Sequence, residues 1–288
     1  GYRPAAAQRL ATARLHRPRA RRLGTDLVLR AAVQGMLDQA WSPEQIGHAL
    51  RERFPDVAVR QLCHESIYQA IYDRDSVLSR HRCGSLRTGR RRRRPRPRGD
   101  ARTPRSLRDM TSIHQRPAGI ADRAEAGHWE GDLITGALNR SAIGTLVERT
   151  TRYTVLVHLP DTHTAFATRD AVIAAMDQLP RHLRRSLTWD QGKEMAHHVQ
   201  ITAAIGAEVY FCDPRSPWQR GTNENTNGLL RQYFPKGANL RVHSAEDLAA
   251  VQAELNNRPR KVLGWTSPAA ALSALQSPHQ EAAVATFA

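Results

Sequence analysis

The sequence predicts an α/β domain built on a mixed sheet, preceded by a small all-helical domain. In the middle of the chain, three strand-like runs joined by short turns come first, and helices and strands alternate after them. Upstream, short amphipathic helices are separated by a turn, as in a helix-turn-helix unit. Between these two patterns the composition changes to arginine and proline, which cannot form a core. We therefore expect a basic helical segment, a helix-turn-helix domain, a linker, the α/β domain and a helical extension, over residues 1–26, 27–82, 83–116, 117–242 and 243–288.

The helical domain carries clear helix start signals. Ser42 is a typical N-cap, and Pro43 suits the first helical position after it. A later helix is predicted near residues 64–72, with Ile67 and Ile71 facing a small core. We expect this helix to enter the major groove of DNA. The base-reading residues are then those at its exposed start, together with the two just before it: Arg60, Gln61, His64 and Gln69.

The α/β domain opens with three runs that are typical of strands, HWEGDLITGAL, SAIGTLVERT and RYTVLVHLP. A helix in TAFATRDAVIAAMDQLP follows. After it come the short strand SLTWD, a helix from Glu194 to Ile205, and the short strand AEVYF. A loop over residues 212–221 leads into a further helix that starts near Thr222. This order matches the ribonuclease H-like fold, a mixed sheet flanked by helices.

Three carboxylates lie where an acid is awkward unless it binds a metal ion or takes part in chemistry. Asp132 lies in an apolar strand, Asp190 ends another strand, and Glu224 begins a helix. In the predicted fold all three can meet at one edge of the sheet. Mg²⁺ and Mn²⁺ prefer hard oxygen ligands, and two such ions can activate an attacking oxygen and stabilise a leaving one. The sequence therefore predicts a site for two divalent ions, with the three acids as ligands and catalytic groups.

Several other residues compete for these roles. Glu130 shares a strand face with Asp132, which makes it an alternative ligand. Asp213 follows a strand and is a second alternative, although its position favours a role at the start of a loop. The adjacent histidines His197 and His198 would diverge on a helix, so we expect a surface pair rather than metal ligands.

The charge of the chain predicts a polyanionic partner. The 288 residues carry a formal net charge of +16, and lysine and arginine that neutralise phosphates release condensed counterions. The five consecutive arginines of the linker either contact phosphates or form a solvated spacer, and Trp218 either stacks on an unpaired base or anchors its loop. A ribosomal or chromatin-like binding protein would show the same charge. Outside the helical domain, the predicted DNA contacts are Arg90, Arg91, Arg92, Arg93, Arg94, Trp218, Arg220, Asn227 and Arg231.

Two further features concern the cellular compartment. No apolar run approaches the roughly 20 residues of a membrane span, and no signal peptide is visible at the start. Cys63, Cys83 and Cys212 form no C-x-x-C pair, which argues against a zinc site or a disulfide framework. We therefore expect reduced thiols in a cytoplasmic protein without a membrane partner.

The motifs around the acids resemble those of DDE-type transposases of the insertion sequence 30 family. The resemblance covers roughly residues 27–275 and lies in GHWEGDLI, NRSAIGTLVERTTRY, LTWDQGKEM, YFCDPRSPWQRGTNENTNGLLRQYFPKG and LNNRPRKVLGW. It implies an enzyme that nicks DNA at the ends of a mobile element and joins the freed 3′-OH to target DNA, with two divalent ions held by three acids. The family's acids fall on Asp132, Asp190 and Glu224, and its basic residue seven positions after the glutamate is Arg231.

The resemblance also implies partners. WSPEQIGHALRERFPD with HESIYQAIY resembles the family's helix-turn-helix, which recognises terminal inverted repeats. Two double-stranded DNA ends must be brought together, so we expect a homodimer or larger assembly in a bacterial, nucleoid-associated protein. Family members usually carry another helix-turn-helix before the GYR segment, and that module is expected to be absent here. A regulator that binds the ends without catalysis, and a structure-specific nuclease of the same fold, are the alternative functions.

Overall fold

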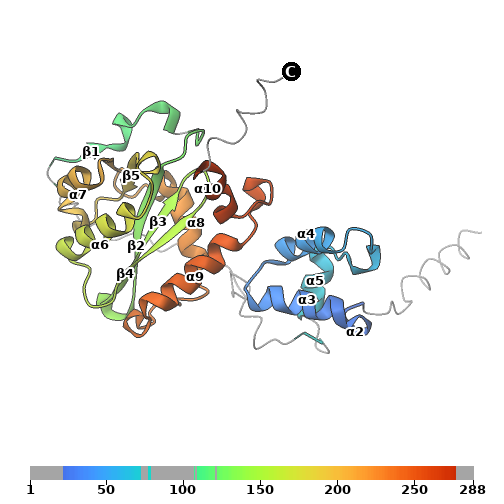
Figure 1. Ribbon diagram of the computed structural model, residues 1–288. Helices are drawn as coiled ribbons and strands as arrows, with labels where there is room; N and C mark the ends of the chain where they lie inside the picture. The colour runs from blue at the N-terminus through green and yellow to red at the C-terminus, as the bar shows by residue number, and fades with distance from the viewer. Residues whose placement is uncertain (1–21, 73–76, 79–106, 108, 121, 277–288) are drawn as a thin grey trace, which may run out of the picture. The chain divides into compact units, whose positions relative to one another are not determined.

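The computed structural model describes residues 22–72, 77–78, 107, 109–120 and 122–276 (Figure 1). The chain divides into two compact units, Gly1–Gly84 and Ser85–Ala288. The arginine run from Arg90 to Arg94, Cys83 and the first 21 residues lie outside the described residues. The expectations attached to them stay predictions.

The first unit is helical and contains the predicted helix-turn-helix elements. Ser42 and Gln45 form a capping box at the start of α4, and Pro43 occupies the first helical position as expected. Ile67 is fully buried and Ile71 packs against the same core, which confirms that both face inward. The described helices are α2 (Arg22–Thr25), α3 (Leu27–Asp38), α4 (Pro43–Arg53), the 3₁₀ turn η1 (Ala58–Arg60) and α5 (His64–Tyr72).

The second unit is built on a six-stranded mixed sheet, with strands in the order β1-β6-β5-β2-β3-β4. β2, β3 and β4 are antiparallel neighbours, whereas β5 lies parallel to β2 and β6 parallel to β5. The three expected leading strands and the two later short ones are all present, and the ribonuclease H-like fold class is confirmed. The strands are β1 (Thr111–Ser112), β2 (His128–Thr135), β3 (Ala142–Glu148), β4 (Thr154–Leu159), β5 (Ser186–Trp189) and β6 (Glu208–Phe211).

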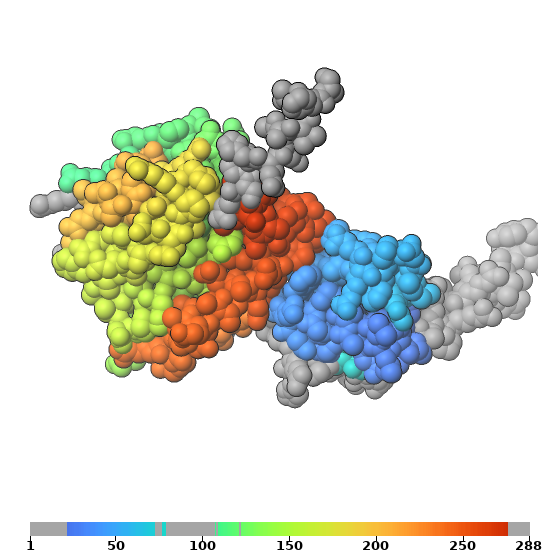
Figure 2. Space-filling view, viewed as in Figure 1, coloured from blue at the N-terminus to red at the C-terminus, as the bar shows by residue number. Residues whose placement is uncertain are grey.

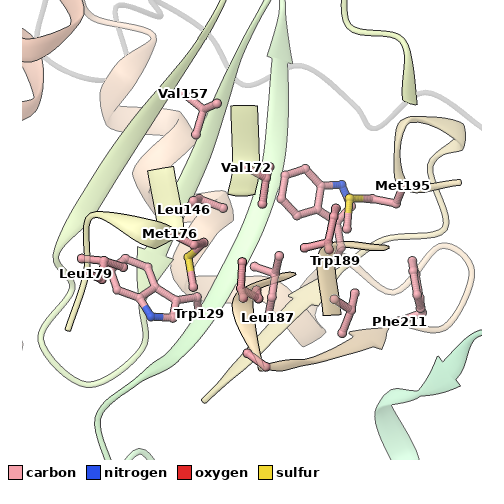
Figure 3. Packing of buried hydrophobic residues seen from close by; sticks show 14 of the residues in the cluster. Trp129, Leu146, Val157, Val172, Met176, Leu179, Leu187, Trp189, Met195 and Phe211 are labelled. Atoms are coloured by element: carbon pink, nitrogen blue, oxygen red, sulfur yellow. The ribbon is translucent and has the colours of Figure 1, made fainter. Parts of the chain in front are cut away.

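Helices cover both faces of this sheet. On one face, α6 (Ala165–Asp177) and α7 (His198–Ile205) bury the larger core, in which Trp129 of β2 and Trp189 of β5 are fully enclosed (Figure 3). On the other face, α8 (Gly221–Leu230) and α9 (Ala245–Asn257) pack on β2, β3 and β4. The last described helix, α10 (Pro268–Gln276), contacts α9, and the two form a continuous orange-to-red strip in the space-filling view (Figure 2).

The structure differs from the sequence prediction in two segments next to the sheet. The segment predicted as the end of the linker contributes β1, which pairs with β6, and Ile113 beside it is buried. The segment after residue 243, predicted as an extension, contributes Leu248 and Leu255 to the core under α9. Both segments therefore belong to the α/β unit.

A third difference lies after β5. The helix expected from Glu194 to Ile205 is divided into the 3₁₀ turn η6 (Lys193–Met195) and α7. His198, expected at the surface, is buried: its ring lies edge-on against Phe211 and contacts the carbonyl oxygens of Met195 and Asp109.

The helices in the described part of the chain include none with the length and apolar character of a membrane span.

Candidate active site

Asp132 and Asp190 come together because β2 and β5 run parallel. Glu130 of β2 is paired with Thr188 of β5. Asp132 and Asp190 each lie two residues after these paired residues, so they are neighbours as well. Asp132 lies on the face of β2 that α8 covers, and Asp190 directly follows the last residue of β5. β5 ends at Trp189 whereas β2 continues to Thr135, so both acids lie at the carboxyl end of β5, and the carboxyl ends of strands are a common place for ligands in α/β folds.

A glycine makes room for this arrangement. A Cβ atom on Gly131 would lie 2.0 Å from the indole ring of Trp189. Gly131 separates Asp132 from Glu130 on β2, so the large core ring packs directly under the backbone that carries both acids. Glycine is therefore required here by close packing.

Arg220 joins the two aspartates. Its Nη1 lies 3.2 Å from Asp132 Oδ1 and its Nη2 lies 3.1 Å from Asp190 Oδ2. Nη1 also donates to the carbonyl oxygen of Gly131 at 2.8 Å. Burial disfavours the charged guanidinium, but the two carboxylates outweigh it and hold the pKa of Arg220 above its ordinary value. Arg220 was expected to contact DNA, whereas its side chain is directed inward to the two acids.

The charge balance around these acids is incomplete. Burial raises the pKa of Asp132, Asp190 raises it further, and Arg220 offsets only part of that rise. Glu194 lies close enough to feel both aspartates: burial raises the pKa of its carboxyl first, and the negative charges of Asp190 and Asp132 add to this. Glu194 was not among the residues predicted for the site. Its position four residues after Asp190 is the one signal in the sequence that could have indicated it. The guanidinium of Arg220 is thus shared by two aspartates, and Glu194 adds a third carboxyl nearby.

Glu224 stands apart from the two aspartates. It is exposed on α8, and within the described part of the chain no three His, Cys, Asp or Glu side chains are grouped closely enough to hold a metal ion. Asn227, one turn further along α8, does reach the site: its Nδ2 donates to Asp132 Oδ2 at 2.9 Å. Residues three apart on a helix share a face, so the side of α8 that carries Glu224 is directed toward Asp132.

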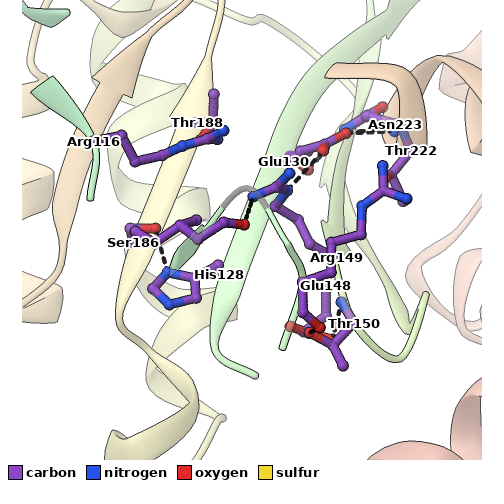
Figure 4. A network of polar contacts seen from close by, with 12 residues as sticks. Arg116, His128, Glu130, Glu148, Arg149, Thr150, Ser186, Thr188, Thr222 and Asn223 are labelled. Carbon is purple, nitrogen blue, oxygen red and sulfur yellow. Dashed lines mark hydrogen bonds and ion pairs between the residues drawn. The ribbon is translucent and has the colours of Figure 1, made fainter. Parts of the chain in front are cut away.

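Glu130, the alternative ligand, has a structural role. Its Oε1 pairs with Arg149 at 3.0 Å, and its Oε2 accepts hydrogen bonds from the backbone amides of Thr222 and Asn223 at 2.9 and 3.0 Å (Figure 4). A carboxylate at these first amides satisfies donors that a helix leaves unpaired and complements its dipole. Glu130 therefore fixes the start of α8 on the sheet and is committed to that contact.

The other alternative, Asp213, also has local partners. Its Oδ2 lies 2.8 Å from His114 Nε2 and accepts from Gln219 Nε2 at 2.8 Å. This supports the expected role at the start of the loop.

Two predicted DNA contacts lie near this loop. In the loop itself, Trp218 is 72% exposed. Arg231 is partly buried, which lowers its pKa, and it donates to the carbonyl oxygen of Phe234.

In the helical unit, the four predicted base readers divide into two pairs. His64 and Gln69 are exposed on α5. Arg60 instead pairs with Asp26 at 2.6 Å and lies over the ring of Phe54, and the amide of Gln61 donates to two backbone carbonyls. The surface open to a partner is therefore that of His64 and Gln69.

The residues at the sheet edge fit a hard divalent cation. The carboxylates of Asp132 and Asp190 already converge on one positive group, and carboxylate oxygens are the ligands that Mg²⁺ and Mn²⁺ prefer. In addition, Asn227 Oδ1 is buried without a hydrogen-bond partner among the described residues, so a further neutral oxygen stands beside Asp132. Two carboxylates and an amide oxygen are thus present, while Glu224 would have to move to join them.

Comparison with known proteins identifies a domain family and several relatives of this chain. Residues 122–217 match the Integrase core domain, which includes Asp132 and Asp190. The transposase for insertion sequence element IS1086 of Cupriavidus metallidurans is 49% identical over 270 residues, which is 93% of this chain and 79% of that protein. Transposase InsI for IS30A of Escherichia coli is 44% identical, over 88% of this chain and 66% of its own length. The transposase for IS4351 of Bacteroides fragilis is 33% identical, over 83% and 71%.

One solved structure can be added to these relatives. The catalytic core domain of BIV integrase aligns with 54% of this chain and 99% of its own, at 16% identity and a TM-score of 0.41. The assignment to a family rests on the sequence relatives, two of which match this chain over more than two thirds of their own length. The chain belongs to the insertion sequence 30 family of transposases, which carry an integrase core domain.

Proposed function

We propose that this chain cleaves and joins DNA strands at the terminal inverted repeats of an insertion sequence, with Asp132, Asp190 and Glu224 as its catalytic acids. The observation that supports this most is the convergence of Asp132, within β2, and Asp190, directly after the parallel strand β5, on the guanidinium of Arg220. The family relationship supports DNA as the substrate and polynucleotidyl transfer as the reaction.

Asp132 and Asp190 would hold divalent ions, with Glu224 completing the site. Such ions supply a polarised attacking oxygen and stabilise the charge on the leaving oxygen. The chain's own residues set the geometry: Asn227 orients Asp132 through Oδ2, and the backbone amide of Gly192 donates to Asp190 Oδ1 at 3.0 Å. Both acids are therefore fixed in place before substrate binds, which lowers the cost of reaching the reactive geometry.

DNA contacts are proposed on both units. In the helical unit, His64 and Gln69 of α5 would read base edges in the major groove. In the α/β unit, the exposed Trp218 would stack on an unpaired base near the cleaved strand. The run from Arg90 to Arg94 would contact phosphates without reading sequence.

Strand joining of an oligonucleotide that mimics the element end tests this function. The protein should cut the 3′ end and join it to target DNA when Mg²⁺ or Mn²⁺ is present, and Ca²⁺ should permit binding with little chemistry, because it prefers looser and longer coordination. Cutting without joining would identify a nuclease, and binding without either reaction would identify a regulator. Chelator-resistant joining would contradict the use of divalent ions.

A further inference from the structure

A buried arginine stands where a bridging ion would bind. We propose that Arg220 is the built-in counter-cation of the metal-free centre, and that a divalent ion must displace its guanidinium from Asp132 and Asp190. The inference rests on the proposed function, because it concerns the same two acids. It makes Arg220 a positioning residue rather than a DNA contact.

The contacts of Arg220 are those of a group built to join two acids. Its two terminal nitrogens each reach a different carboxylate, at 3.2 Å for Asp132 and 3.1 Å for Asp190. A planar guanidinium can hold two oxygens at once in a fixed fork, which an ammonium cannot do. The side chain is only 11% exposed, compared with 28% and 44% for the two aspartates. It therefore lies beneath them as part of the protein interior.

An entering ion would compete for the same oxygens. Asp132 Oδ2 is held by Asn227 and Asp190 Oδ1 by the amide of Gly192, so Asp132 Oδ1 and Asp190 Oδ2 are the oxygens that Arg220 occupies. A metal that bridges the aspartates through these two oxygens would stand next to the guanidinium. Two positive groups so close together repel each other, and the guanidinium of Arg220, only 11% exposed, is poorly screened by water. Metal binding at these oxygens and the present Arg220 contact would therefore weaken each other.

The side chain can leave without moving α8. Arg220 is the last residue of the 3₁₀ turn η7 (Pro217–Arg220), directly before the helix. Glu130 holds the amides of Thr222 and Asn223, so the helix start stays anchored to the sheet when the guanidinium departs. Arg220 Nε is buried with no hydrogen-bond partner among the described residues. The present position of the side chain is thus incompletely satisfied, which favours its displacement.

Manganese binding to the full chain, measured by calorimetry in the absence of DNA, tests the proposal. Arg220→Gln should bind Mn²⁺ about tenfold more tightly than the unaltered protein, or better, because the competing charge is gone. Arg184→Gln is the matched control. Arg184 pairs with Asp177 at 2.5 Å and its side chain is 16% exposed, so the same charge is removed from a similar environment away from the aspartates. Its Mn²⁺ affinity should not change.

Thermal unfolding supplies a second readout. In chelator, Arg220→Gln should unfold at a lower temperature than the unaltered protein, because the two carboxylates repel each other without a counter-cation. Saturating Mn²⁺ should remove that difference. If the glutamine variant does not fold, Arg220→Lys replaces it: lysine keeps the charge but cannot span both acids, so a smaller gain in affinity is expected.

The outcomes separate this inference from the proposed function. Loss of Mn²⁺ binding in Asp132→Asn and Asp190→Asn, with unchanged or weaker binding in Arg220→Gln, would overturn the role of Arg220 and leave the metal site intact. Mn²⁺ binding that is absent from the unaltered protein, or indifferent to both aspartates, would overturn the metal site and the role of Arg220 together.

Discussion

Glu130 and Asp132 stand two residues apart on the same face of β2, yet their surroundings are opposite. Glu130 is 1% exposed, and both of its oxygens are engaged by Arg149 and by the first amides of α8. Asp132 is 28% exposed and shares one arginine with Asp190, and burial raises its pKa. A buried carboxylate whose two oxygens are both paired, such as Glu130, has a structural role. A partly exposed carboxylate whose negative charge is only partly balanced, such as Asp132, is available for a cation.

The largest expected difference between the two acids is in activity. Asp132→Asn should lower strand joining by about a thousandfold or more, because metal-assisted stabilisation of the transition state contributes several kcal/mol. The melting temperature in chelator should hardly change, since Asp190 still pairs with Arg220 and the repulsion between the two aspartates is removed. Joining assays and thermal unfolding of the same preparation measure both effects. Retained activity would remove Asp132 from the site.

The reverse result is expected for Glu130. Glu130→Gln leaves Arg149 buried without its charge partner, so the free energy of unfolding should fall by about 3–5 kcal/mol. Denaturant unfolding measures this loss. At temperatures where the variant is folded it should still bind Mn²⁺, because Glu130 is committed to α8. If Glu130→Gln were as stable as the unaltered protein but unable to bind Mn²⁺, the roles assigned to the two acids would be exchanged.

His128 on β2, two residues before Glu130, should make the stability of the fold depend on pH. Burial lowers the pKa of His128 to about 4, and Arg185 and Arg149 contribute to this. Between pH 6.5 and about 4 the unfolded chain therefore binds a proton there that the folded chain does not, so stability falls as the pH falls through this window. The loss attributable to His128 should reach up to about 3 kcal/mol near pH 4.

The variant His128→Gln isolates that contribution. Other acids titrate in both proteins, so the difference between their unfolding curves from pH 7 to pH 4 reports His128. As the pH falls, the free energy of unfolding should decrease less in the variant than in the unaltered protein. Parallel curves over the whole range would show that His128 titrates normally.

The smallest of these effects is expected at the glycine between the two acids. In Gly131→Ala the new methyl group would overlap the ring of Trp189, and overpacking of a core typically costs about 1–3 kcal/mol. Because the strain lies under Asp132, joining activity should fall as well. The double variant Gly131→Ala with Trp189→Phe relieves the overlap and should recover part of the stability. Without such recovery, the contact with Trp189 would not be the reason for the glycine.

The sequence allowed the sheet to be predicted better than the charge arrangement. Apolar runs separated by turn residues revealed the central strands, and the ribonuclease H-like fold that their order matched placed Asp132 beside Asp190. The two-residue strand β1 has no periodicity and follows a run of arginine and proline, so nothing in the sequence separated it from the linker.

The misplaced side chains share a physical reason. Arg220 lies in a loop of proline, glycine and polar residues, where an arginine normally faces solvent, and only the folded structure shows the two acids that draw it inward. Glu130 and Asp132 have the same strand face and the same charge, so alternation could not tell which of them the start of α8 would occupy. His198 is buried because its ring packs on Phe211 of β6 and its nitrogens contact two backbone carbonyl oxygens, contacts between distant segments that the sequence does not show.

The assignment of Asp132 and Asp190 as metal ligands is tested most directly by the position of manganese in a crystal of the protein soaked with Mn²⁺, located by anomalous scattering. We expect a peak coordinated by both Asp132 and Asp190, with the Arg220 guanidinium withdrawn from them. A peak bound elsewhere, or none at an Mn²⁺ concentration that supports strand joining, would contradict the assignment of these acids as the metal-binding centre.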